Sequence, residues 1–122
     1  MSNLSGNWKV LCSTGQLLPG GGVAALVDGQ QVALFYLPGQ ETTIYAIDNM
    51  DPASGAAVLA RGIIGDLGGE PVVASPLYKQ HYSLRTGECL EDSTLNVQAW
   101  PCMIKDDQVY IEAISNAERL AS

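Results

Sequence analysis

The sequence predicts an all-β domain, a small antiparallel sandwich or barrel with at most one or two short helices. Short runs of β-branched and aromatic residues recur along the 122 residues, and turn-forming residues separate them. Two of these turns, Asp28-Gly29 and Asp106-Asp107, have the residue types of tight hairpins. A chain of this length is too short for two ordinary domains, so we expect a single domain over residues 1–122.

The first part of the chain predicts three strands. Residues 8–12 form the first, which ends before a glycine-rich loop. Residues 23–27 and 31–36 are apolar runs on either side of Asp28-Gly29. Because this dipeptide readily adopts the positive φ angles of a two-residue turn, the two runs are predicted to pair as a hairpin.

The middle of the chain predicts two strands around an irregular region. Residues 42–47 are β-branched and aromatic, which favours a strand. Residues 48–55 have no regular pattern, and residues 56–61 could form one or two helical turns before Gly62. A further strand is predicted at residues 71–74.

The last part predicts three more strands, at residues 81–84, 95–100 and 108–112, with the final one pairing back across Asp106-Asp107. In the first of these, alternation places His81 and Ser83 on one face, which we expect to face solvent. A Thr86-Gly87 turn follows it, and the tail at residues 115–122 is expected to fray.

Composition excludes several classes of function. The net charge is −7, and the six Lys and Arg residues are dispersed, so nucleic acid is not an expected partner. No apolar run is long enough for a membrane span, and the first residues do not resemble a secretory signal, so we expect a cytoplasmic protein. One histidine and three scattered cysteines do not form a zinc site or a disulfide framework.

We predict no catalytic residue in this chain. Ser75 precedes Pro76 without a nucleophile elbow, and His81 is the one histidine that could activate it. Carboxylates are plentiful, but the sequence places none of them in an apolar pocket that would separate the pKa values of an acid and a base.

Three segments resemble the cluster-binding loops of Rieske iron–sulfur domains: residues 48–56, 72–79 and 82–87. The Rieske pattern has a Cys-x-His loop and a Cys-x-x-His loop, followed by an aromatic strand and a Thr-Gly turn; two thiolates hold one iron and two imidazoles the other. In this chain the four ligand positions are occupied by Asp51, Ala53, Ser75 and Tyr78. A Rieske-like domain with a degenerate cluster-binding subdomain, residues 46–82, is therefore expected.

Over almost its whole length the sequence resembles the small subunit of the bacterial NAD(P)H-dependent nitrite reductase, most specifically at Ala74-Ser75-Pro76-Leu77. The resemblance implies a Rieske-like β-sandwich within a cytoplasmic enzyme that reduces nitrite to ammonium. It also implies that the large subunit carries FAD, sirohaem and an iron–sulfur cluster. We expect this chain to bind no cofactor or metal, and to act as an accessory subunit that binds and stabilises the large one.

In a Rieske domain the two loops form a tip that is also a docking surface. Here the loops would present five largely apolar residues, which we call the apolar tip: Met50, Pro52, Pro76, Leu77 and Tyr78. These side chains could instead fill the space between the loops, and the sequence does not decide between the two. Two other functions stay open: a Rieske-type 2Fe–2S electron carrier with atypical ligands, and a free-standing binding module.

Overall fold

The computed structural model describes residues 8–113 of the chain. Within them the fold is all-β, with two single turns of 3-10 helix, as predicted. The elements are β1 (Trp8–Ser13), η1 (Thr14–Gln16), β2 (Gly21–Val27), β3 (Gln30–Tyr36), β4 (Ile44–Asp48), η2 (Leu59–Arg61), β5 (Ile63–Leu67), β6 (Glu70–Ala74), β7 (His81–Ser83), β8 (Ala99–Trp100), β9 (Cys102–Lys105) and β10 (Gln108–Glu112). Neither helical turn in this part of the chain could cross a bilayer.

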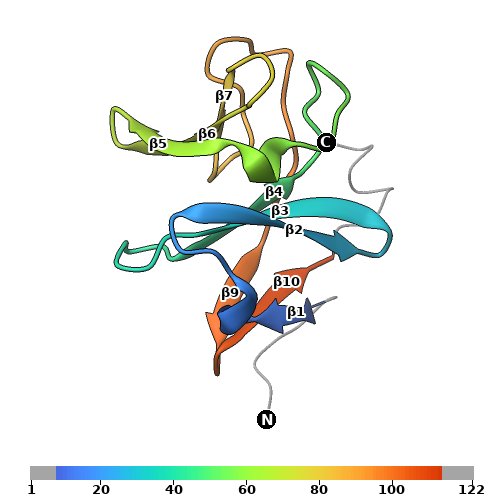
Figure 1. Cartoon of the computed structure of the whole chain (residues 1–122), viewed down its shortest axis with the longest axis vertical. Helices are drawn as coiled ribbons and strands as arrows, with labels where there is room; N and C mark the ends of the chain where they lie inside the picture. The colour runs from blue at the N-terminus through green and yellow to red at the C-terminus, as the bar shows by residue number, and fades with distance from the viewer. Residues whose placement is uncertain (1–7, 114–122) are drawn as a thin grey trace.

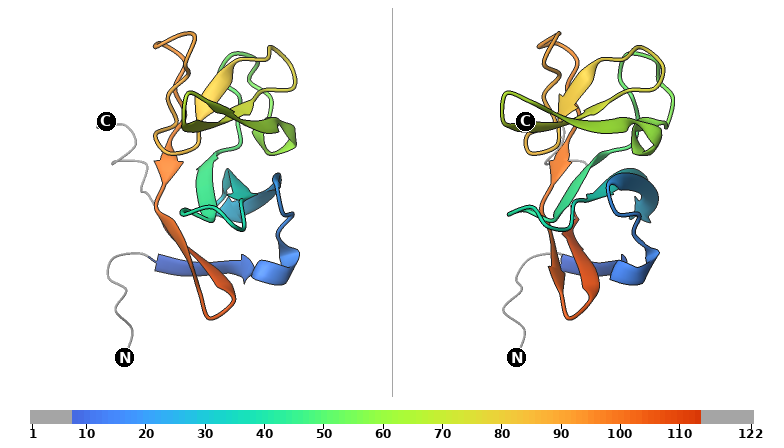
Figure 2. Two further views of the ribbon diagram at one scale, coloured as in Figure 1. Left: turned by 90° about the vertical axis from the view of Figure 1, so that its left-hand side faces the viewer. Right: turned by 60° about the vertical axis from the view of Figure 1, so that its left-hand side comes forward.

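The strands form three antiparallel sheets that lie one above another in Figure 1. The lowest has the order β1-β10-β9, the middle one β2-β3-β4-β8, and the uppermost β5-β6-β7. Figure 2 shows the same division from two further sides. The predicted tail at residues 115–122 lies outside the described residues.

The middle sheet is covered on both faces, which explains why β3 is apolar from residue 32 onward. Val32 and Leu34 pack into a core shared with the lower sheet, whereas Ala33 and Phe35 pack into a core shared with the upper one. All four are almost fully buried. Since successive side chains of a strand point to opposite faces, the part of a strand that lies between two cores needs apolar residues on both faces.

Two tight hairpins occur where the sequence predicts them. Asp28 and Gly29, with φ angles of 50° and 81°, connect β2 to β3. Asp106 and Asp107, with φ angles of 53° and 62°, connect β9 to β10. Positive φ at both central residues matches the right-handed twist of the paired strands.

Two predicted segments are much shorter in the structure. Residues 56–61 give only the 3-10 turn η2. Residues 95–100 give only the short strand β8, because residues 97 and 98 bond to separate partners: Val97 N donates to Gly87 O, and Gln98 N to Asp48 Oδ2. Strand β5 was not predicted at all. It pairs with β6 across a Gly68-Gly69 turn, which is the signal that could have revealed it.

Candidate functional site

Two loops meet at the upper end of the molecule. The first follows β4 of the middle sheet and contains Asp51, and the second, between β6 and β7 of the upper sheet, begins at Ser75. Ser75 Oγ donates a hydrogen bond to Asp51 Oδ2 over 2.5 Å, and both residues are buried. The two residues at the predicted cysteine positions are therefore bonded directly to each other.

The first loop is a closed turn around Asp51. Gly55 N donates to Asp51 O at 2.7 Å, and Asp51 N donates to Ala56 O at 2.8 Å. The Asp51 side chain caps the same turn, because Oδ1 accepts a hydrogen bond from Ala53 N at 2.9 Å. Ala53 thus contributes its backbone N–H to the site, while its methyl group offers no ligand atom.

The second loop is closed in a similar way by Ser75. Lys79 N donates to Ser75 O at 3.0 Å, and Ser75 N donates to Gln80 O at 2.9 Å. Lys79 adopts a positive φ of 63°, a conformation that a residue with a side chain takes up at some cost. Because Ser75 is bonded to Asp51, the position of this loop is fixed relative to the first one.

Tyr82 is a third member of the cluster, which sequence reasoning missed. It lies on β7 with no exposed surface, and its hydroxyl donates to Asp51 Oδ1 at 3.2 Å. The alternation of β7 placed Tyr82 in the core, but it gave no sign of a partner 31 residues away. Burial beside the Asp51 carboxylate raises the pKa of Tyr82 far above its ordinary value.

Asp51 is a buried carboxylate that is stabilised in its charged form. Burial by itself raises the pKa of Asp51, but hydrogen bonds from Ser75, Ala53 N and Tyr82 outweigh it, and the net pKa is lowered. Hydrogen bonds to an ionised oxygen are stronger than bonds between neutral groups. The cluster therefore acts as an electrostatic tether between the two loops, which we call the Asp51 tether (Asp51, Ser75 and Tyr82).

The four ligand positions do not fit a Rieske cluster. Such a cluster needs two thiolates and two imidazoles, whereas this site has a carboxylate, a methyl group, a hydroxyl and a phenol. The Asp51–Ser75 hydrogen bond directly joins two of the four positions that would have to supply ligands. Tyr78, at the last position, is 62% exposed and lies outside the tether. Among residues 8–113, no three His, Cys, Asp or Glu side chains lie together in a way that could hold a metal ion.

The apolar tip lies on the surface of both loops. Met50 is 46% exposed and Leu77 50%, and Pro52 and Pro76 are exposed as well. The two loops are joined by the Asp51 tether, which contains none of the tip side chains. They leave an exposed apolar surface of the kind that partner proteins cover.

His81 and Ser83 do not both face solvent, contrary to the prediction. Ser83 is buried and its hydroxyl donates to Glu70, which the exposed Arg85 also contacts at 3.2 Å. His81 is partly buried, and its Nδ1 lies 2.6 Å from Glu91 Oε2. The prediction failed because β6 lies beside β7 and brings Glu70 over this face.

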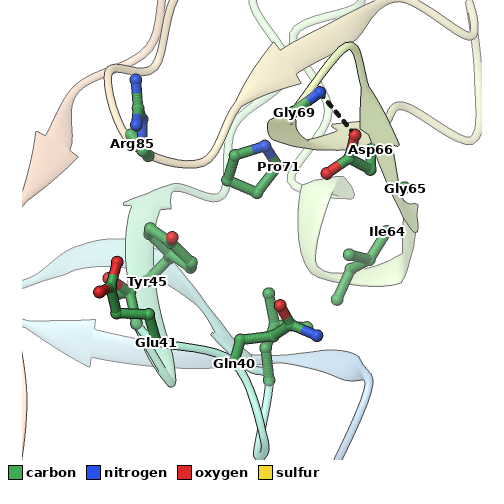
Figure 3. Close-up of a pocket in the computed structure, with 11 residues that line it drawn as sticks. Gln40, Glu41, Tyr45, Ile64, Gly65, Asp66, Gly69, Pro71 and Arg85 are labelled. Atoms are coloured by element: carbon green, nitrogen blue, oxygen red, sulfur yellow. Dashed lines mark hydrogen bonds between the residues drawn. The ribbon is translucent and has the colours of Figure 1, made fainter.

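A separate cleft of about 380 Å³ lies between the β3–β4 connection and the β5–β6 hairpin (Figure 3). Tyr45, Asp66 and Arg85 are among the side chains around it, and Asp66 Oδ1 accepts a hydrogen bond from Gly69 N at 2.8 Å. Neither loop of the tether contributes to its walls. Its lining, which is partly polar, contains no nucleophile with an adjacent base. That the chain has no catalytic residue remains a prediction.

Known proteins are similar to this chain in sequence and in fold. The family model of the Rieske-like [2Fe-2S] domain matches residues 7–112. A nitrite reductase (NADH) small subunit from Salmonella typhimurium is 42% identical over 104 residues, 85% of this chain and 95% of the relative. The solution structure of a nitrite reductase [NAD(P)H] small subunit from Erwinia carotovora has a TM-score of 0.75 and 40% identity, covering 89% of this chain and 83% of that one.

A large subunit contains a similar stretch. The nitrite reductase [NAD(P)H] large subunit of Klebsiella oxytoca is 39% identical over 104 residues, so this chain spans 11% of that protein's length.

Fold and site together define a Rieske-like domain whose two loops are joined by side chains rather than by ligands of a cluster. The extent of the likeness to whole small subunits narrows this class further. The chain belongs to the family of nitrite reductase (NADH) small subunits. The resemblance that the sequence indicated is thereby confirmed.

Proposed function

We propose that this chain is the accessory small subunit of a cytoplasmic NAD(P)H-dependent nitrite reductase, and that it binds and stabilises the large subunit without a redox centre of its own. The observation that carries the proposal is the Ser75–Asp51 hydrogen bond. It joins the two loops where a Rieske domain would hold its cluster, and it leaves the apolar tip exposed for docking. The tip can therefore serve recognition, while electron transfer belongs to the partner.

The match within a large subunit supports the partnership. In Klebsiella oxytoca, a segment of 104 residues similar to this chain is part of the large subunit itself. Two domains in one polypeptide stay at high effective concentration, which favours contact between them. We infer that a separate small subunit makes the corresponding contact across a subunit interface.

In this proposal the redox chemistry of the complex takes place on the large subunit. The large subunit would carry FAD, sirohaem and an iron–sulfur cluster, and would pass electrons from NADH or NADPH to nitrite to give ammonium. In this scheme the present chain supplies binding surface only. Neither nucleic acid nor a membrane is a partner in this proposal. The net charge of −7 disfavours binding to nucleic acid.

Anaerobic reconstitution with iron and sulfide separates the accessory subunit from an electron carrier. We expect the purified chain to take up no stoichiometric iron and to show neither the absorption nor the EPR signal of a Rieske centre, because its donor set lacks thiolate and imidazole pairs. A Rieske ferredoxin treated in parallel is the positive control. A Rieske-type spectrum from this chain would refute the accessory role in favour of a 2Fe–2S carrier.

Binding to the large subunit tests the apolar tip. We expect the chain to co-purify with the large subunit, and Leu77→Ser to weaken that complex by about tenfold or more, because a half-exposed apolar side chain at the centre of an interface contributes about 1–2 kcal/mol. Leu18→Ser is the matched control, since Leu18 is 56% exposed in the connection between η1 and β2, outside both loops of the tip. Equal effects of the two substitutions would exclude the tip as the contact surface. Failure of the wild-type chain to bind would favour a free-standing module.

A further inference from the structure

A shallow groove of about 330 Å³ lies beside the apolar tip. Its walls come from three consecutive parts of the upper region: the end of η2, the start of β5, and the turn between β6 and β7. Ile63 and Pro76 give it apolar walls, while Arg61 and Lys79 are exposed cationic residues on its rim. We call this feature the cationic groove (Arg61, Ile63, Pro76 and Lys79).

The groove contains two of the three Lys and Arg side chains that form no ion pair within residues 8–113; the third, Lys105, lies on β9. Of the basic residues in the described part of the chain, Lys9 pairs with Asp28 and Arg85 with Glu70. Arg61 and Lys79 form no ion pair within residues 8–113, although acidic residues outnumber basic ones about two to one over the whole sequence. Two uncompensated cations on one groove of an acidic protein favour an anionic partner at this place.

The apolar part of the groove is equally unusual. Ile63 is 78% exposed, more than any other large apolar side chain in the described residues. It lies on β5, at the edge of the upper sheet, opposite Ala74 of β6. An exposed isoleucine between two cations is suited to a binding partner that brings an apolar side chain and a carboxylate together.

The groove is held in place before any partner arrives. Ser75 lies at its base and accepts the Lys79 N–H at 3.0 Å, while its own hydroxyl is bonded to Asp51. His81, also on the wall, is engaged by Glu91. Since the Asp51 tether fixes the β6–β7 turn, ordering this wall adds little to the entropic cost of association.

We propose that the cationic groove receives a segment of the large subunit in which a carboxylate lies next to an apolar side chain. The carboxylate pairs with Arg61 and Lys79, and the apolar side chain covers Ile63 and Pro76. This inference rests on the proposed function, and it adds the chemistry of the partner surface. A small anion fits less well, because the groove is open and apolar and lacks a set of convergent buried donors.

Charge reversal at the rim tests the proposal with the full chain and the purified large subunit. We expect Arg61→Glu and Lys79→Glu each to raise the Kd by about tenfold at 50 mM salt, and less at 300 mM salt, because the lost attraction is screened. Ile63→Ser is expected to raise the Kd by about tenfold at both salt concentrations. All three side chains are exposed, so thermal melting is expected to be unchanged.

Lys105→Glu is the matched control. It makes the same change in net charge at an exposed lysine that forms no ion pair within the described residues, on the β9–β10 hairpin at the opposite end of the molecule (Figure 1). We expect its Kd to stay within about twofold of the wild-type value.

The outcomes test the cationic groove and the accessory function separately. If the wild-type chain binds the large subunit and the rim variants behave like Lys105→Glu, the cationic groove is excluded while the accessory function stands. If the wild-type chain does not bind, the accessory function itself fails. Titration with sodium nitrite, followed by the amide resonances of residues 61–63 and 79, gives a third result: saturation at micromolar nitrite would overturn the peptide-binding groove in favour of a small-anion site.

Discussion

Asp51→Ala is expected to lower the free energy of unfolding by about 2–4 kcal/mol, since each buried polar group left without a partner costs about 1–3 kcal/mol. Asp51 has no exposed surface and accepts hydrogen bonds from Ser75, Tyr82 and Ala53 N. Its removal leaves the buried hydroxyl groups of Ser75 and Tyr82 without this acceptor, and it breaks the link between the two loops. Urea unfolding of both proteins measures the loss.

An exposed carboxylate provides the control for this substitution. Glu41 lies on the surface of the β3–β4 connection, and Glu41→Ala is expected to change the free energy of unfolding by less than about 0.5 kcal/mol. A double-mutant cycle with Ser75→Ala then measures the coupling across the tether. A coupling near zero would show that the 2.5 Å contact contributes nothing to joining the loops.

The same carboxylate makes stability depend on pH. Because the pKa of Asp51 is lower in the folded state than in the unfolded one, its contribution is complete above the unfolded value of 3.8 and is lost as the pH falls through the folded value. The stability gap between wild type and Asp51→Asn should therefore stay constant at higher pH and narrow as the pH is lowered from about 4 towards 2. A gap that is constant over this range would contradict the lowered pKa.

Gly87→Ala is expected to destabilise the fold by at least about 3 kcal/mol, the sum of an unfavourable φ and a steric overlap. Gly87 has a φ of +81°, and a Cβ atom there would lie 2.0 Å from Val97 O. The surrounding backbone cannot yield easily, because Val97 N donates to Gly87 O and Gly87 N donates to Ser83 O. Thermal and urea unfolding of the variant provide the measurement.

Gly29→Ala separates the effect of the unfavourable φ from the effect of the steric overlap. Gly29 has the same φ of +81°, but a Cβ atom added there would meet no other atom within 4 Å, so only the backbone conformation is penalised. We expect a loss of about 1–2 kcal/mol there. If both alanine variants lost the same stability, the close approach of residues 87 and 97 would not be a determinant of this fold.

Local chemistry explains which elements the sequence could predict. The Asp28-Gly29 turn and the apolar runs beside it specify β2 and β3 without any help from distant residues. Strand β5 has exposed residues at four of its five positions, so it lacks the alternation that marks a half-buried strand. Residues 95–98 alternate as a strand would, yet their backbone groups bond to Gly87 and Asp48, which no local pattern reveals.

The candidate site was predictable in position but not in construction. Alignment with the two Rieske loop patterns located Asp51 and Ser75. The absence of the four cluster ligands does not predict which interactions join the loops in their place. The hydrogen bonds of Asp51 span 24 residues to Ser75 and 31 to Tyr82, distances over which only the tertiary fold sets geometry. Exposure of the apolar tip was undecidable for the same reason, since it depends on whether something else fills the space between the loops.

The Asp51 tether has a consequence for how the subunit is made. A tip that is joined through iron can close only after metal and sulfide have been delivered, and it opens again when oxidation or chelation removes them. A carboxylate, a serine and a tyrosine arrive with the chain and close the tip as it folds. We therefore expect this chain to fold and close its tip equally well in iron-depleted and iron-replete medium.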